Sequence, residues 1–183
     1  SKNDSTILNI KKISFNNSFQ RCTRVYFDSL NPDLFLNNFY STESTHDSLL
    51  LDVFKSSIRY NIISNKDSII QNLNIGWDSE ILSYKNKLID TILTNQSLSL
   101  DFSKSEINNS FRLGGNFYPL GYKKNNYEIN FLYESFILKD KKFKISADLS
   151  EFRPVFEINN YQSNHHFWDN KQFNNILFWN ASS

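Results

Sequence analysis

His165 and His166 are the residues best suited to chemistry, because imidazole titrates near neutral pH and binds transition metals. Asp169 is close enough in sequence to orient one of the two rings. Adjacent side chains point in different directions on a regular backbone, however, and the sequence contains no His-x-His, His-Glu-x-x-His or Cys-x-x-Cys spacing. We therefore expect no metal site and no catalytic residue here. The histidine pair is interpreted as part of a loop, with His-dependent hydrolase or isomerase chemistry as the alternative.

Other catalytic arrangements are also poorly represented. Cys22 has no neighbouring base and is interpreted as a small buried hydrophobic residue. Glu128 and Glu134 share one face of an expected strand, but about 20 Å separates their Cα atoms, which is too far for an acid–base pair. Gly114 and Gly115 lack the further glycines and the lysine of a phosphate-binding loop. The sequence thus favours a non-enzymatic protein without a cofactor.

Aromatic residues are concentrated near the C-terminal end of the sequence, where Trp and Tyr are suited to anchor a protein interface. We expect the loop that carries Phe167 and Trp168 to be exposed and to contact another chain. The candidate binding residues are Tyr161, His165, His166, Phe167, Trp168 and Trp179. The first hypothesis is therefore a module for protein-partner binding or assembly, including self-association.

Two further binding functions stay open. A curved sheet can enclose a small apolar ligand in a cup. Lysines are interleaved with aromatic residues at 122–127 and 139–143, as in proteins that bind single-stranded nucleic acid. The net charge of +1 and the position of these lysines in expected turns argue against nucleic acid.

Length and composition predict one domain. The 183 residues suffice for a core, and the absence of a second cysteine excludes an intrachain disulfide. No apolar run approaches 18 residues, so the sequence predicts no membrane span. The compartment is not fixed, and a soluble intracellular protein is favoured. Abundant Asn, Lys, Ile and Phe together with 4 Gly and no Met indicate an AT-rich genome.

Alternation of apolar and polar residues predicts several strands. It is clearest over 127–149, where a charged break at 139–142 predicts an antiparallel hairpin with one face on the core and one in water. Alternation also predicts strands over 97–103 and 111–117 and a last short strand over 175–180. Gly114 and Gly115 mark a bulge or a close approach of backbone.

At the N-terminal end, residues 6–15 and 19–28 predict a first hairpin with its turn at 16–18. Arg21 and Arg24 fall on opposite faces of its second strand, which favours an edge position over a central one. An anionic ligand for these two arginines is the alternative.

Helical spacing predicts helices between residues 32 and 94. A short helix is expected over 33–40, and a capping box at Ser44 and Asp47 precedes a second one that extends to about residue 63, with a strand over 58–62 as the alternative for its end. Residues 79–94 predict a one-sided helix with Ile81, Leu88 and Ile92 on its apolar stripe. The expected fold is a single α+β domain, 1–183, in which these helices pack on one face of an antiparallel sheet.

Overall fold

The computed structural model describes residues 8–29, 44–66, 68–87, 89–138, 141–154, 156, 160–162, 167–169 and 174–182. Ten strands make up nearly all of this part of the chain. They are β1 (Leu8–Ser29), β2 (Ser44–Lys66), β3 (Ile69–Asn86), β4 (Asp90–Ser105), β5 (Asn109–Gly121), β6 (Tyr127–Leu138), β7 (Lys141–Phe152), β8 (Asn160–Gln162), β9 (Phe167–Asp169) and β10 (Ile176–Ser182).

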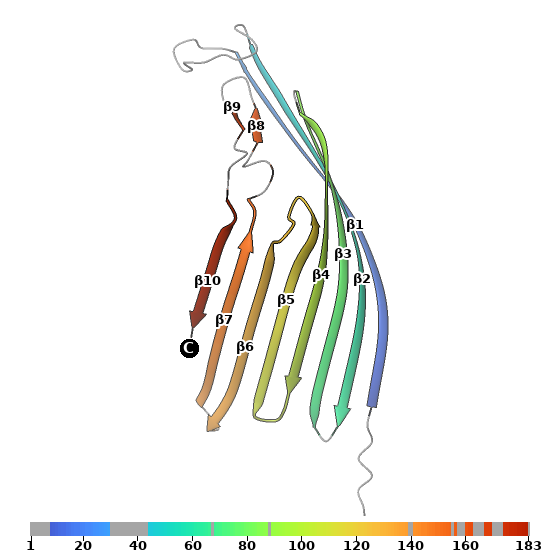
Figure 1. The fold of residues 1–183 in the computed structure, drawn as a ribbon, viewed down its shortest axis with the longest axis vertical. Coiled ribbons are helices and arrows are strands. Elements are labelled where there is room, and N and C mark those ends of the chain that lie inside the picture. The colour runs from blue at the N-terminus through green and yellow to red at the C-terminus, as the bar shows by residue number, and fades with distance from the viewer. Residues whose placement is uncertain are drawn as a thin grey trace, which may run out of the picture.

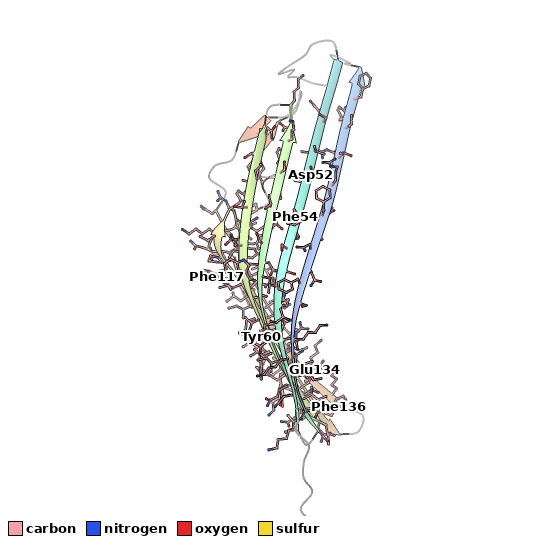
Figure 2. The ribbon with its side chains drawn as sticks, turned by 90° about the vertical axis from the view of Figure 1, so that its right-hand side faces the viewer. Asp52, Phe54, Tyr60, Phe117, Glu134 and Phe136 are labelled. Atoms are coloured by element: carbon pink, nitrogen blue, oxygen red, sulfur yellow. The ribbon has the colours of Figure 1, made fainter. Side chains whose placement is uncertain are left out.

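Eight of the strands form one antiparallel sheet in the order β1-β2-β3-β4-β5-β6-β7-β10. Neighbours in sequence are neighbours in space, so the sheet is a meander (Figure 1). β8 and β9 pair separately as a two-stranded sheet. The large sheet is twisted and one layer thick, with side chains projecting from both faces (Figure 2). The α+β prediction is therefore wrong: the described part of the chain is almost entirely β-sheet.

The helices expected over 44–63 and 79–94 are strands instead. Ser44, the expected helix cap, begins β2, and β3 ends at Asn86 before a turn leads to β4. The error has a physical cause, because apolar residues stand on both faces of these strands and so imitate helical spacing. Adjacent pairs such as Leu50–Leu51 and Ile81–Leu82 illustrate this arrangement. The helix expected over 33–40 lies outside the described residues.

The N-terminal hairpin is also a wrong prediction. β1 continues through residues 16–18, which pair with residues 55–57 of β2 in an unbroken antiparallel ladder. Asparagine tolerates a turn but does not require one, and the ladder supplies every backbone group facing β2 with a partner. The expected edge position of 19–28 is confirmed, since β1 ends the sheet order.

The strands expected in the C-terminal half are confirmed. β6 pairs with β7 as the predicted hairpin, from Tyr127↔Glu151 to Leu138↔Lys141. β4, β5 and β10 correspond to the other alternating stretches. The ladder shifts between Gln96 and Leu98, not at the two glycines.

Turns alternate between the two ends of the sheet. The β2–β3, β4–β5 and β6–β7 turns lie at one end, and the β3–β4 and β5–β6 turns lie at the other (Figure 1). The β5–β6 turn begins at Gly121, whose φ of 102° is left-handed, and includes Asn125 with a φ of 69°. Both residue types tolerate this backbone region.

Candidate functional site: the apolar band

One face of the eight-stranded sheet carries most of its large apolar side chains. Because paired residues project to the same face, the register defines rows that cross the sheet. The central row consists of Ile13, Tyr60, Ile75, Leu100, Gly115, Ile129, Leu149 and Trp179. Every position of this row except Gly115 carries a large apolar or aromatic side chain.

The rows on either side of the central row have the same character. One consists of Phe15, Ile58, Trp77, Leu98, Phe117, Tyr127, Glu151 and Leu177. The other consists of Lys11, Ile62, Leu73, Phe102, Leu113, Phe131, Ala147 and Ala181. We call these three rows the apolar band. Its charged members are Lys11 and Glu151.

A polar row flanks the apolar band on each side along β1 to β4, and beyond one of these two rows the same face carries Phe19, Phe54 and Ile81. Beyond it on β1 to β4, one flanking row is Asn9, Ser64, Gln71 and Lys104, and the other is Asn17, Ser56, Ser79 and Gln96. Eight residue steps separate Asn9 from Asn17, which is about 26 Å of extended chain. On β6, the apolar residues of this face run from Tyr127 in the band to Tyr133, one row beyond it. The Cα atoms of these two tyrosines are six residue steps, or about 20 Å, apart.

Across the strands the apolar band has no boundary. It reaches Phe15 on edge strand β1 and Trp179 on edge strand β10, which are 69% and 73% exposed. The apolar stretch also shifts along the sheet, because Ile13 begins it on β1 while Leu149 of the same row ends it on β7. The apolar stretches of successive strands are therefore staggered, so the apolar surface as a whole is inclined to the strands while the three rows of the band cross the whole sheet.

The opposite face of the sheet is polar at the same level along the strands. The row that lies between those of Lys11 and Ile13 consists of Lys12, Asn61, Asn74, Asp101, Gly114, Asn130, Asp148 and Asn180. We call this side the polar face. Short side chains such as Ser97 and Ser99 are buried on it, at 5% and 7% exposure. The rings of Tyr84 and Phe156 meet edge-to-face on this side, with centroids 5.1 Å apart. Among the described residues, Phe156 therefore packs on the polar face of the sheet and not on the apolar band.

Ion pairs connect neighbouring strands on the polar face. Arg59 Nη2 donates to both Asp78 carboxylate oxygens, at 2.7 and 2.8 Å, and the Arg59 side chain covers Gly76. A Cβ at position 76 would collide with this guanidinium, so glycine provides the room for the pair. Further along β3, Glu80 accepts from Asn95 Nδ2 at 2.8 Å and from Lys123 Nζ at 3.1 Å.

The surroundings of Glu80 give a pH-dependent prediction. Burial alone would raise the pKa of Glu80, but Lys123 and the amide of Asn95, helped by Lys55, hold this pKa below its ordinary value. Glu80 follows Ser79, a member of the polar row that flanks the apolar band, and its side chain is on the polar face. A lowered folded-state pKa contributes stability above the unfolded value of about 4.3, and this stability is lost as the pH falls through the folded-state pKa. We expect Glu80→Gln to reduce the loss of unfolding free energy on acidification below about pH 4. Denaturant titrations at pH 7 and pH 3 measure this, and an unchanged difference would contradict it.

Arg21 and Asp52 form an ion pair beyond the apolar band, towards the β3–β4 end of the sheet. Their two contacts, Nε to Oδ1 and Nη2 to Oδ2, both measure 2.7 Å. The hydrogen bond from Arg21 lowers the pKa of Asp52. Asp52 thus provides Arg21 with an anionic partner from within the chain.

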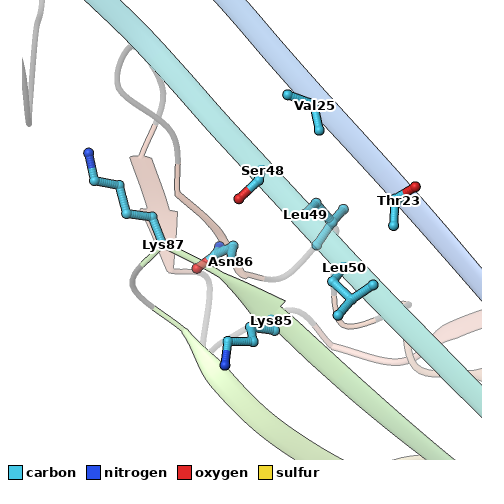
Figure 3. Close-up of a pocket in the computed structure, with 8 residues that line it drawn as sticks. All are labelled: Thr23, Val25, Ser48, Leu49, Leu50, Lys85, Asn86 and Lys87. Carbon is cyan, nitrogen blue, oxygen red and sulfur yellow. The ribbon is translucent and has the colours of Figure 1, made fainter.

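Two hollows lie on or near the apolar side. The first, of about 640 Å³, is formed where β1, β2 and the end of β3 meet (Figure 3). Its lining residues are Thr23, Val25, Ser48, Leu49, Leu50, Lys85, Asn86 and Lys87. The second, of about 580 Å³, is centred on Gly115, where the central row lacks a side chain between Leu100 and Ile129.

The structure places one of the residues predicted to bind a partner in the apolar band. Trp179 belongs to its central row. In the small β8–β9 sheet, Tyr161 pairs with Trp168 and Gln162 with Phe167 along the backbone, and the positions of these side chains are not described. His165 and His166 lie outside the described residues. Cys22, expected to be buried, is exposed on β1.

Sequence reasoning missed the apolar band as a unit. A usable signal was present: β5 and β6 each have an apolar stretch of the same length with aromatic residues at both ends, Phe111 to Phe117 and Tyr127 to Tyr133. Only the register shows that these stretches align across the sheet.

No helix in the described part of the chain is long and apolar enough to cross a membrane. Among the described residues there is also no group of three or more His, Cys, Asp or Glu side chains placed to hold a metal ion. Comparison with protein families, curated proteins and solved structures finds no match.

Proposed function

We propose that the chain is a membrane-embedded structural module, with the apolar band in contact with lipid acyl chains and the polar face turned towards water. The shape of the band carries this proposal. It is flanked by polar rows on β1 to β4 and has aromatic residues at its borders on β5 and β6, yet it runs without a polar rim to both edges of the sheet. A patch for one protein partner normally has a polar rim around it. A strip with two boundaries matches a slab of hydrocarbon.

The dimensions support the same conclusion. A strand that crosses a bilayer uses about 9–11 residues, and lipid-facing apolar bands are about 25 Å tall with aromatic residues at their borders. The three rows span four residue steps, about 13 Å, and the polar rows that flank them on β1 are about 26 Å apart along the strand. The inclination of the apolar surface to the strands fits strands that are tilted in a membrane. Alternation of apolar and polar side chains then places most residues of the band in lipid and most residues of the polar face in water.

This proposal replaces the expectation of no membrane span, which rested on the length of continuous apolar runs. Such runs identify helices, whereas a strand needs an apolar residue only at every second position. Binding of a protein partner stays a prediction, and the backbone of β8 and β9, which carries three of the residues that motivated it, belongs to a separate sheet. A protein that covers the apolar face instead of lipid is an outcome that the following experiment detects.

Fluorescence of Trp77 tests contact with lipid. Trp77 is 37% exposed in the row next to the boundary row of Ser79. Replacing the other two tryptophans, Trp168 and Trp179, by phenylalanine leaves it as a single probe. In phosphatidylcholine vesicles with brominated acyl chains, we expect strong quenching of Trp77, greatest for bromines near the headgroups, and little quenching by aqueous acrylamide.

A matched control places the probe on the other face. Glu128→Trp in a background without other tryptophans puts the ring on the polar face at the same height, on an exposed position of β6. This probe should respond to acrylamide and not to brominated lipid. Equal responses of the two probes would overturn the proposal. Protection of Trp77 from both quenchers would indicate a protein on the apolar face.

A further inference from the structure

The two edge strands have backbone groups without a partner in the sheet. β1 ends the strand order on one side and β10 on the other, so each has a ladder on one side only among the described residues. β1 runs for 22 residues. Neither strand contains proline, glycine or a bulge, which are common devices against edge pairing. Four cations, at Lys11, Lys12, Arg21 and Arg24, leave residues 13–20 of β1 free of charge.

The apolar band reaches both of these edges. An unpaired N–H or C=O group in hydrocarbon costs several kcal/mol, so open sheet edges are not stable against lipid. This argument rests on the proposed function. If the band lies in a bilayer, the outer edges of β1 and β10 require hydrogen-bonding partners at the height of Ile13 and Trp179.

The edges of two copies fit each other. In an antiparallel sheet of eight strands the first and last strands run in opposite directions, so β10 of one copy can pair antiparallel with β1 of the next. Leu177 and Trp179 of β10 would then continue the apolar band beside Ile13 and Phe15. Pairing of β1 with β1 would instead bring Lys11 and Lys12 of both copies to one interface, whereas β10 carries no charge.

We propose that the chain self-associates by edge pairing, with β10 of one copy hydrogen-bonded to β1 of a second copy. The interface is heterologous, since each copy uses two different edges. The apolar band then continues from copy to copy, and the polar faces share one side of the extended sheet.

Cysteine cross-linking between differently labelled copies tests the pairing. In a Cys22→Ser background, one chain carries Trp179→Cys, and a second chain carries Lys11→Cys, Ile13→Cys or Phe15→Cys, which all lie on the apolar face. The chains are mixed before reconstitution into phosphatidylcholine vesicles and then oxidised. We expect a disulfide-linked dimer of the two chains for at least one of the three positions, because paired residues have Cα atoms about 5 Å apart, within the range of a disulfide. Leu100→Cys, in the central row but on β4, should not cross-link to Trp179→Cys.

Three other results would overturn the proposal. A chain that carries both cysteines and forms the disulfide within one copy would show that its own two edges pair. Dimers of the Ile13→Cys chain alone would show pairing of β1 with β1. Absence of cross-links at all three positions would show that other strands occupy the edges. Quenching of Trp77 by brominated lipid, measured on the same samples, separates a failure of the edge pairing from a failure of the membrane proposal.

Discussion

Arginine in place of Ile129 is expected to lower the free energy of unfolding in a phospholipid bilayer by about 2–4 kcal/mol. Ile129 lies in the central row of the apolar band, on a strand with neighbours on both sides. A guanidinium at this height must leave water or distort the bilayer to stay hydrated, and either process costs free energy. Reversible unfolding by guanidinium chloride in vesicles, followed by tryptophan fluorescence, measures the difference.

Glu128→Arg is the matched control for this change. It introduces the same side chain at the adjacent residue of β6, but on the polar face. We expect the free energy of unfolding to change by less than about 1 kcal/mol, as for an ordinary surface substitution. If Ile129→Arg is tolerated as well as Glu128→Arg, the apolar band does not contact hydrocarbon, and the membrane proposal fails.

The parts of the fold that the sequence predicted share one property. In β5, β6 and β7, apolar residues such as Ile129, Phe131 and Ile145 alternate with polar ones over most of each strand, so the period of a strand fits best. In β2 and β3 both faces are apolar in places, as at Leu49–Leu51 and Ile81–Leu82. Helical and extended periods then fit equally well, and the pairing of these strands with β1 and β4 decides between them.

The candidate site was less predictable than the strands. Alternation predicts that one face of each strand avoids water, and a buried core is the usual reason. Whether a protein layer or lipid covers that face depends on how the apolar stretches of different strands align, which is a property of the register. Ile13 and Trp179 share a row although they lie at opposite ends of the sequence. No local pattern in a single strand contains that information.

Alanine in place of Gly121 is expected to lower the free energy of unfolding by about 3 kcal/mol or more, combining left-handed strain with overpacking. Gly121 has a φ of 102°, which a residue with a Cβ adopts only with strain. The added Cβ would also collide with the carbonyl oxygen of Thr94, whose position is fixed by a 3.0 Å hydrogen bond from the Tyr122 N–H. Because this contact is with backbone, a change of rotamer cannot relieve it.

Gly115→Ala provides the comparison. This residue has no left-handed φ, and its added Cβ would meet the Glu128 carbonyl oxygen at 3.0 Å, which a small backbone shift accommodates. The new methyl group would occupy part of the hollow between Leu100 and Ile129. We therefore expect Gly115→Ala to change the free energy of unfolding by less than about 1 kcal/mol, within the range of a mild packing change. Equal losses in denaturant titrations of the two variants would show that the β5–β6 turn does not depend on the backbone conformation of Gly121.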